Sequence, residues 1–255
     1  MFPMSSMLSF TEIQAHSCEE VEDFVKIASA LLVNIGTVTS DWVSSKKLAA
    51  NAANFLGKPW VLDPVGCGAT PFRTKVCKEM FELKPWIVRG NASEIMSLAG
   101  VAEGPTRGVD TTSATTDAIA AAVALAKAGD CVVAVSGAVD VVTDGSTIVE
   151  VHNGIAMMAD ITGTGCSVTA ICAAFCAVLP KERALEAAAY GLACLGVAAE
   201  RAMASGNVRG PASLRVAMVD ELYNLDEKAM LGEICNGKGP RVRLVQRSVS
   251  EKCNI

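Results

Sequence analysis

The segment Ala30-Leu-Leu-Val-Asn-Ile-Gly36 is a short and mainly apolar run that ends at a glycine. A run of this length and composition is typical of a strand that is buried on both faces of a sheet. The helix predicted next begins at about Asp41, with Ser40 as its N-cap and Gly57 just beyond its end. Trp60-Val-Leu-Asp-Pro64 predicts another buried strand, which gives this part of the chain a strand–helix–strand pattern.

Strand-like and helix-like segments alternate along the rest of the chain, roughly 25–30 residues apart. Beyond the first unit, we expect strands at 85–90 and 131–136, a hairpin at 141–151, and helices at about 72–83, 117–128, 166–179, 181–205 and 210–224, with a short helix opened by Asn91. This pattern predicts an α/β fold with a mainly parallel sheet and helices on both faces. Without an internal repeat or linker, residues 1–255 are expected to form a single domain, with 240–255 as a flexible tail.

The composition of the 255 residues limits the possible classes of function. Hydrophobic residues make up 51% of the chain and charged residues 19%, so a large core can be buried. The net charge of −5 and the lack of basic runs interleaved with aromatic residues argue against a nucleic-acid partner. The uncharged helical stretches are too short to span a membrane, and Met1 to Leu8 does not resemble a signal peptide.

The ten cysteines are expected to be free thiols. Several of them, such as Cys172 and Cys176, lie within apolar helical segments, where a free cysteine behaves as a small hydrophobic residue. The chain has no CxxC pair and only two histidines, which argues against a zinc site. We therefore expect a reducing compartment, either the cytoplasm or an organelle.

The segment Ile161-Thr-Gly-Thr-Gly-Cys166 leads directly into an apolar helix. Glycines allow a sharp turn, and the first turn of a helix presents free N–H groups and a positive dipole end. Gly163, Thr164, Gly165 and Cys166 could therefore hold a phosphoryl group during its transfer. A tight loop that only starts a helix is the alternative.

Cys166 falls in the first turn of that predicted helix, where the dipole favours a negatively charged group. Its thiolate could accept the proton of an attacking alcohol. The alternative is a structural cysteine, one of ten in the chain.

Two carboxylates follow predicted parallel strands and should lie on the same edge of the sheet. Glu94 belongs to Asn91-Ala-Ser-Glu94, and Asp63 ends the strand before Pro64. Both could belong to a Mg²⁺ site, with Asn91 fixing the orientation of the ligands. The alternatives are a helix cap for Asn91 and Glu94, and a simple turn for Asp63 and Pro64.

Arg107, in the loop-like stretch 100–116, could clamp phosphate oxygens, although an exposed arginine without a role fits equally well. The chain lacks a GxxxxGK[ST] sequence, so a P-loop kinase is not expected.

Taken in order, the motifs resemble those of hydroxyethylthiazole kinases in the ribokinase superfamily. They are Asp63-Pro-Val, Arg89-Gly-Asn-Ala-Ser-Glu94, Arg107-Gly-Val-Asp, Val135-Ser-Gly-Ala-Val-Asp140, Thr143-Asp-Gly145, Val151-His-Asn-Gly154 and Gly163-Thr-Gly-Cys166. The match runs from about His16 to the region of Leu214, and the cysteine at 166 is its specific part, because most ribokinase relatives have aspartate there. The resemblance implies a ribokinase-like three-layer fold and ATP-dependent phosphorylation of the alcohol of 4-methyl-5-(2-hydroxyethyl)thiazole in thiamin salvage.

The resemblance also implies roles for individual residues. Arg107 and Ser136 would contact ATP, and Asp63 and Glu94 would belong to the Mg²⁺ network. Gly163 would contact the thiazole alcohol, the segment from Gly163 to Cys166 would form the anion hole, and Cys166 would be the catalytic base. A homotrimer is implied as well.

Residues 1–15 depart from the family pattern, which has a strand and a helix there that line the thiazole pocket. By position, Gln14 stands where the family has a pocket methionine. Two alternatives therefore remain: a related vitamin or pyrimidine alcohol kinase, and a nucleotide-binding protein without catalytic activity.

Overall fold

The computed structural model describes residues 15–101, 111–226 and 239–247. Its strands form one seven-stranded sheet, and their order in space follows their order in the sequence. The strands are β1 (Leu31–Asn34), β2 (Trp60–Asp63), β3 (Ile87–Asn91), β4 (Val132–Ser136), β5 (Asp140–Thr143), β6 (Thr147–Val151) and β7 (Val242–Arg247). The first four are mutually parallel, and each later strand pairs antiparallel with the one before it.

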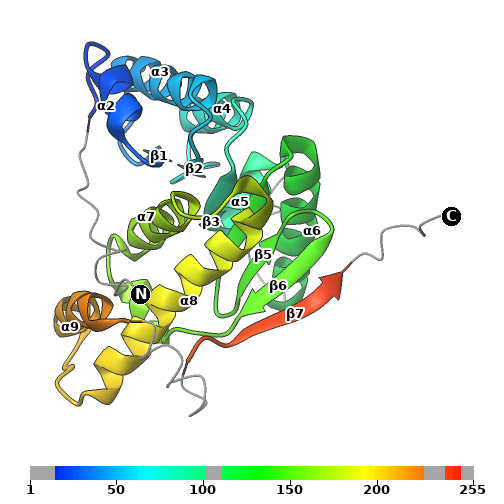
Figure 1. The fold of residues 1–255 in the computed structure, drawn as a ribbon. Coiled ribbons are helices and arrows are strands. Elements are labelled where there is room, and N and C mark those ends of the chain that lie inside the picture. Colours follow the sequence, from blue (N-terminus) through cyan, green and yellow to red (C-terminus); the bar gives the residue numbers. More distant parts are fainter. Residues whose placement is uncertain (1–14, 102–110, 227–238, 248–255) are drawn as a thin grey trace, which may run out of the picture.

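Helices cover both faces of this sheet (Figure 1). One layer contains α2 (Val21–Ile27), α3 (Ser40–Phe55), α4 (Pro71–Phe81), α5 (Ala92–Leu98) and α6 (Thr111–Gly129). The other contains α7 (Thr164–Cys176), α8 (Ala184–Ala204) and α9 (Pro211–Asn224), together with the short 3-10 helices η1 (Ala156–Asp160) and η2 (Lys181–Arg183). Among the described residues, no helix is both long and apolar enough to cross a membrane.

Successive residues of the central strands point into opposite layers. Val61 and Ile87 pack with residues of α7 and α8, whereas Leu62 and Val88 pack with residues of α3 to α6. This alternation is the geometric consequence of the pleated strand, and it explains why apolar residues occupy successive positions in these strands. The predicted α/β fold, with a mainly parallel sheet covered on both faces, is confirmed.

The predicted start of α3 needs a correction. Its N-cap is Thr39 and not Ser40, because the Thr39 side chain accepts a hydrogen bond from the N–H of Trp42 at 3.3 Å. The predicted end is correct, since Gly57 lies just past the C-cap Leu56 with a φ of 65°.

Part of the predicted flexible tail is an ordered strand. Val242–Arg247 is β7, the last strand of the sheet. It pairs with β6, the second strand of the hairpin that β5 and β6 form. The remaining tail residues 248–255 lie outside the described residues.

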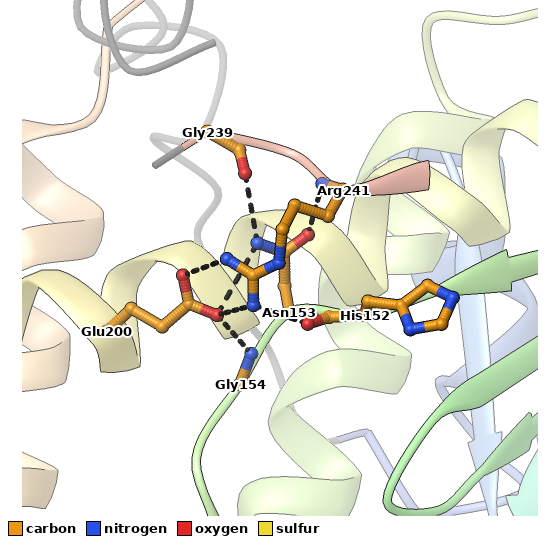
Figure 2. A network of polar contacts seen from close by, with 6 residues as sticks. All are labelled: His152, Asn153, Gly154, Glu200, Gly239 and Arg241. Carbon is orange, nitrogen blue, oxygen red and sulfur yellow. Dashed lines mark hydrogen bonds and ion pairs between the residues drawn. The ribbon is translucent and has the colours of Figure 1, made fainter. Parts of the chain in front are cut away.

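A cluster of polar contacts fastens the start of β7 to α8 (Figure 2). The guanidinium of Arg241 donates to both carboxylate oxygens of Glu200, at 2.7 and 3.0 Å, and to the carbonyl oxygen of His152. The buried side chain of Asn153 donates to the Gly239 carbonyl at 3.1 Å and accepts from the Arg241 N–H at 2.7 Å. These contacts explain why the chain is held in place before β7 begins.

Candidate active site

Polar side chains gather where the parallel strands end. Asn34 and Asp63 are the last residues of β1 and β2 and stand opposite each other in the sheet. Asn91 and Ser136, the last residues of β3 and β4, form the next such pair. The carboxyl ends of parallel strands are the usual position of ligand sites in α/β proteins.

Helix α7 begins beside this edge with an open amino-terminal turn. Gly163 is its N-cap, with a φ of 94° that favours glycine. The hydroxyl of Thr164 donates to the Ile161 carbonyl at 2.9 Å, and the N–H of Ser167 donates to the Gly163 carbonyl at 2.9 Å. Between them, the N–H groups of Gly165 and Cys166 have no acceptor within the described parts of the chain. Free N–H groups at a helix start attract anions.

Asp63 is almost fully buried at this edge, with 1% of its surface exposed. Its Oδ2 accepts hydrogen bonds from Asn34 Nδ2 and from the Thr169 hydroxyl, each at 3.0 Å. Its Oδ1 is buried without a partner among the described residues. Burial raises the pKa of Asp63 to about 6, an effect opposed by the positive charge of Arg89 and reinforced by the negative charge of Glu94.

The thiol of Cys166 lies over the end of β1. Asn34 Nδ2 donates to its sulfur at 3.2 Å, and Cys166 is exposed. The side-chain amide of Asn34 therefore links two predicted site residues, Asp63 and Cys166. Asn34 itself was not predicted from the sequence.

Arg89 is the buried cation of the site, and sequence reasoning gave it no role. Its guanidinium donates to the Ser136 hydroxyl, while its Nε has no partner among the described residues. A Cβ at position 165 would stand 2.6 Å from its Nη1, so the guanidinium lies against the first turn of α7. Its charge also opposes the rise in the pKa of Asp140 to about 6, which burial causes. An arginine within an otherwise apolar strand was the signal in the sequence.

Asn91 and Glu94 form the helix cap that was considered as the alternative to a metal site. Asn91 Oδ1 accepts from the Glu94 N–H, and Glu94 Oε2 accepts from the Asn91 N–H, both at 2.9 Å. Glu94 Oε1 also accepts from the N–H of Gly66 at 2.8 Å, which ties the loop after β2 to α5. Each carboxylate oxygen can accept a further contact, so capping does not exclude a second role.

Two of the predicted site residues, Gln14 and Arg107, lie outside the described residues. Across the described ranges, no three histidine, cysteine, aspartate or glutamate side chains cluster closely enough to hold a metal ion by themselves. Asp63 and Glu94 provide two carboxylates near each other, which suits an ion that also binds water and phosphate oxygens.

Most of the chain matches a known protein family. Residues 9–228 match the model of the hydroxyethylthiazole kinase family. The chain belongs to this family. A hydroxyethylthiazole kinase of Arabidopsis thaliana is 48% identical over 219 residues, which are 86% of this chain and 78% of that protein. One from Thermoanaerobacter pseudethanolicus is 46% identical over 84% of this chain and 80% of its own length.

Solved structures agree with this family assignment. The hydroxyethylthiazole kinase of Pyrococcus horikoshii superposes with a TM-score of 0.80 and 36% identity, over 94% of this chain and 87% of that one. A pyridoxal kinase of Staphylococcus aureus superposes with a TM-score of 0.51 and 20% identity, over 69% of this chain and 65% of its own, a likeness of fold alone. The predicted ribokinase-like fold is thereby confirmed.

Proposed function

We propose that this member of the hydroxyethylthiazole kinase family transfers the γ-phosphoryl group of ATP to the primary alcohol of 4-methyl-5-(2-hydroxyethyl)thiazole in thiamin salvage. The observation that carries the proposal is the position of Arg89, a buried cation with a free Nε beside the open first turn of α7. A guanidinium and free N–H groups that lie side by side can bind a phosphoryl group and stabilise its negative charge, which is what phosphoryl transfer requires.

The reaction forms a bond between the alcohol oxygen and the γ-phosphorus and breaks the bond from that phosphorus to the leaving oxygen of ADP. The N–H groups of the anion hole, Gly163 to Cys166, would stabilise the negative charge on the transferred group. The guanidinium of Arg89, which lies against the first turn of α7, would add its positive charge to these N–H groups. The alcohol, held against Gly163, would give its proton to the thiolate of Cys166.

The donor set at Asp63 and Glu94 fits a Mg²⁺ ion. Both residues offer hard carboxylate oxygens, and the buried Oδ1 of Asp63 lacks any partner within the described residues. When bound there, Mg²⁺ would neutralise charge on the phosphates of ATP. Asp63 would remain oriented by Asn34 and Thr169, and Glu94 by its backbone donors.

Other residues are assigned by position. Ser136, which accepts from Arg89, and Arg107 would contact the nucleotide. Asn91 would hold Glu94 in place through the helix cap, and Gln14 would line the pocket of the thiazole.

We also propose a homotrimer in a reducing compartment such as the cytoplasm. The trimer rests on the family resemblance. The compartment is supported by the eight cysteines of the described parts of the chain, all of which are free thiols and six of which are buried.

A steady-state assay with hydroxyethylthiazole, ATP and Mg²⁺ tests this function directly. We expect turnover, with a kcat that Cys166→Ala lowers by roughly 10²-fold or more. Thermal shifts with Mg·ATP and with the thiazole, added separately, distinguish the alternatives, because each ligand stabilises only a protein that binds it. Stabilisation by ATP alone, without turnover, would favour a non-catalytic nucleotide-binding protein, and turnover of a pyrimidine alcohol instead would favour the related kinase.

A further inference from the structure

The side-chain amide of Asn34 is fully engaged at the end of β1. Its Oδ1 accepts from the N–H of Gly36 at 2.7 Å. Its Nδ2 donates to Asp63 Oδ2 at 3.0 Å and to Cys166 Sγ at 3.2 Å. An amide nitrogen carries two hydrogens, so it can serve both acceptors at once.

The backbone around Asn34 fixes which way the amide faces. A Cβ at position 36 would stand 2.8 Å from Asn34 Oδ1, so the N–H of Gly36 approaches this oxygen where a larger residue would collide. An amide turned the other way would place two N–H donors, Nδ2 and the Gly36 N–H, against each other. The Nδ2 atom is therefore held toward Asp63 and Cys166.

The Asp63 carboxylate is anchored from the opposite side as well. The hydroxyl of Thr169, one turn along α7 from Cys166, donates to the same Oδ2 that accepts from Asn34. Asn34 thus lies between a fixed carboxylate and an exposed thiol that has no other partner among the described residues.

We propose that Asn34 is a positioning residue that directs the sulfur of Cys166 and favours its thiolate by donating one N–H to it. A side chain in an exposed first helical turn otherwise exchanges between rotamers. A donor fixes one of them, and it bonds a charged acceptor more strongly than a neutral one. The inference rests on the proposed function only in taking Cys166 as the proton acceptor.

Alkylation of Cys166 by iodoacetamide tests the contact without any turnover. The probe reacts with thiolates, and peptide mapping by mass spectrometry can report Cys166 against Cys18, the other exposed cysteine among those described. We expect Asn34→Asp to slow alkylation of Cys166 by about tenfold or more relative to Cys18, the scale of a lost hydrogen bond to a charged group. This substitution keeps the acceptor for Gly36 and removes the donor.

Asn34→Leu is the matched control for the charge that Asn34→Asp introduces. It removes the donor without adding charge, so it should also slow alkylation. Parent-like alkylation in both variants would overturn the proposal. Slow alkylation in Asn34→Asp alone would also overturn it, because repulsion between the new carboxylate and the thiolate would explain that result.

A double-mutant cycle with Cys166→Ala tests whether Asn34 acts through the thiol. In the parent, Asn34→Asp should lower kcat by about tenfold or more with little change in the KM for ATP. In the Cys166→Ala background, it should have little further effect. An equal loss in both backgrounds would mean that Asn34 acts through Asp63, and would sink the inference. A parent without turnover would instead contradict the proposed function, while the alkylation rates would still decide the contact.

Discussion

Arg89 and Gly165 lie so close together that a side chain at position 165 would require the Arg89 guanidinium to move. A Cβ there would stand 2.6 Å from Arg89 Nη1 and 3.5 Å from its Cζ. Gly165 lies within α7 and its φ is not positive, so close approach and not backbone freedom explains the glycine. The expectation that both glycines serve the turn is therefore correct for Gly163 and wrong for Gly165.

Gly165→Ala should displace the Arg89 guanidinium and lower kcat by roughly 10²-fold or more, the effect of losing one charge-stabilising donor. Gly163→Ala meets open space but a strained φ, so we expect it to lower stability more than Gly165→Ala does. Steady-state kinetics and urea unfolding of both variants check this contrast. A fully active Gly165→Ala enzyme would show that Arg89 need not lie where it does.

Replacing Arg89 by lysine should lower kcat by roughly 10²–10³-fold, because an ammonium keeps the charge but lacks the planar guanidinium that donates to Ser136 and lies against Gly165. Arg183→Lys, in an exposed ion pair with Glu186, is the matched control and should leave kcat unchanged. Parent-like kinetics of Arg89→Lys would remove Arg89 from the site.

Arg107→Ala should weaken ATP binding by roughly 1.5–3 kcal/mol in a titration experiment, because a hydrogen bond to a charged phosphate is lost.

Cys166→Asp should keep activity or raise it, provided that the thiazole still binds. A carboxylate is ionised at neutral pH, whereas an ordinary thiol is mostly protonated, and both the helix dipole and Asn34 Nδ2 favour an anion there. Cys166→Ala should lose roughly 10²-fold or more in kcat. The measurement is kcat for both variants from pH 6 to 9. Parent-like turnover of Cys166→Ala would make Cys166 a packing residue only.

Asp63 should make the folded protein less stable as the pH rises. Burial raises the pKa of its carboxyl to about 6, above the value of about 4 in an unfolded chain. The folded state therefore binds more protons between these values, and the stability that Asp63 contributes at low pH is lost as the pH rises through 6. Asp63→Asn removes this titration, so its stability relative to the parent should increase by roughly 1–3 kcal/mol from pH 4.5 to 7.5.

Urea unfolding at the two pH values, without nucleotide or Mg²⁺, measures that difference. Asp130→Asn is the control, since the Asp130 carboxyl is exposed and lies in a surface ion pair with Lys181. If the difference in unfolding free energy between Asp63→Asn and the parent does not change with pH, the raised pKa of Asp63 in the folded state is contradicted.

Asn153→Ala should destabilise the fold by roughly 1–3 kcal/mol, because it leaves the Gly239 carbonyl and the Arg241 N–H without their partner in a buried place (Figure 2). Urea denaturation measures the loss. Asn224→Ala, which removes only an exposed contact within α9, should change stability far less. Equal losses in the two variants would show that the Asn153 contacts add little.

The sequence predicts those parts of the molecule that depend on neighbours along the chain. The strands at 60–63 and 132–136, the hairpin that turns at Asp144 and Gly145, and the start of α7 all follow from local patterns of apolar residues and glycine. The roles of Asn34 and Arg89 depend on partners 132 and 47 residues away, Cys166 and Ser136, which no local pattern contains.

The end of the chain shows the same limit. Val242–Arg247 mixes charged and apolar residues, and the side chains of 242–245 are exposed, so its sequence resembles that of a tail. Its strand conformation comes from pairing with β6 and from the Arg241 contacts, both of them tertiary. An edge strand with water on its open side needs few apolar residues.

The order of the strands also bears on the order in which the chain folds. From β1 to β6, each strand pairs with the next one in the sequence, so these pairings close comparatively short loops, whereas β7 returns to β6 only after α7, α8 and α9. The contacts of α7 with the sheet edge close far longer ones, since Thr169 meets Asp63 across 106 residues and Cys166 meets Asn34 across 132. A chain growing from the ribosome can therefore assemble β1 to β6 before α7 docks. The site is completed after most of the sheet that supports it, and an unfinished chain holds structure before it can hold a substrate.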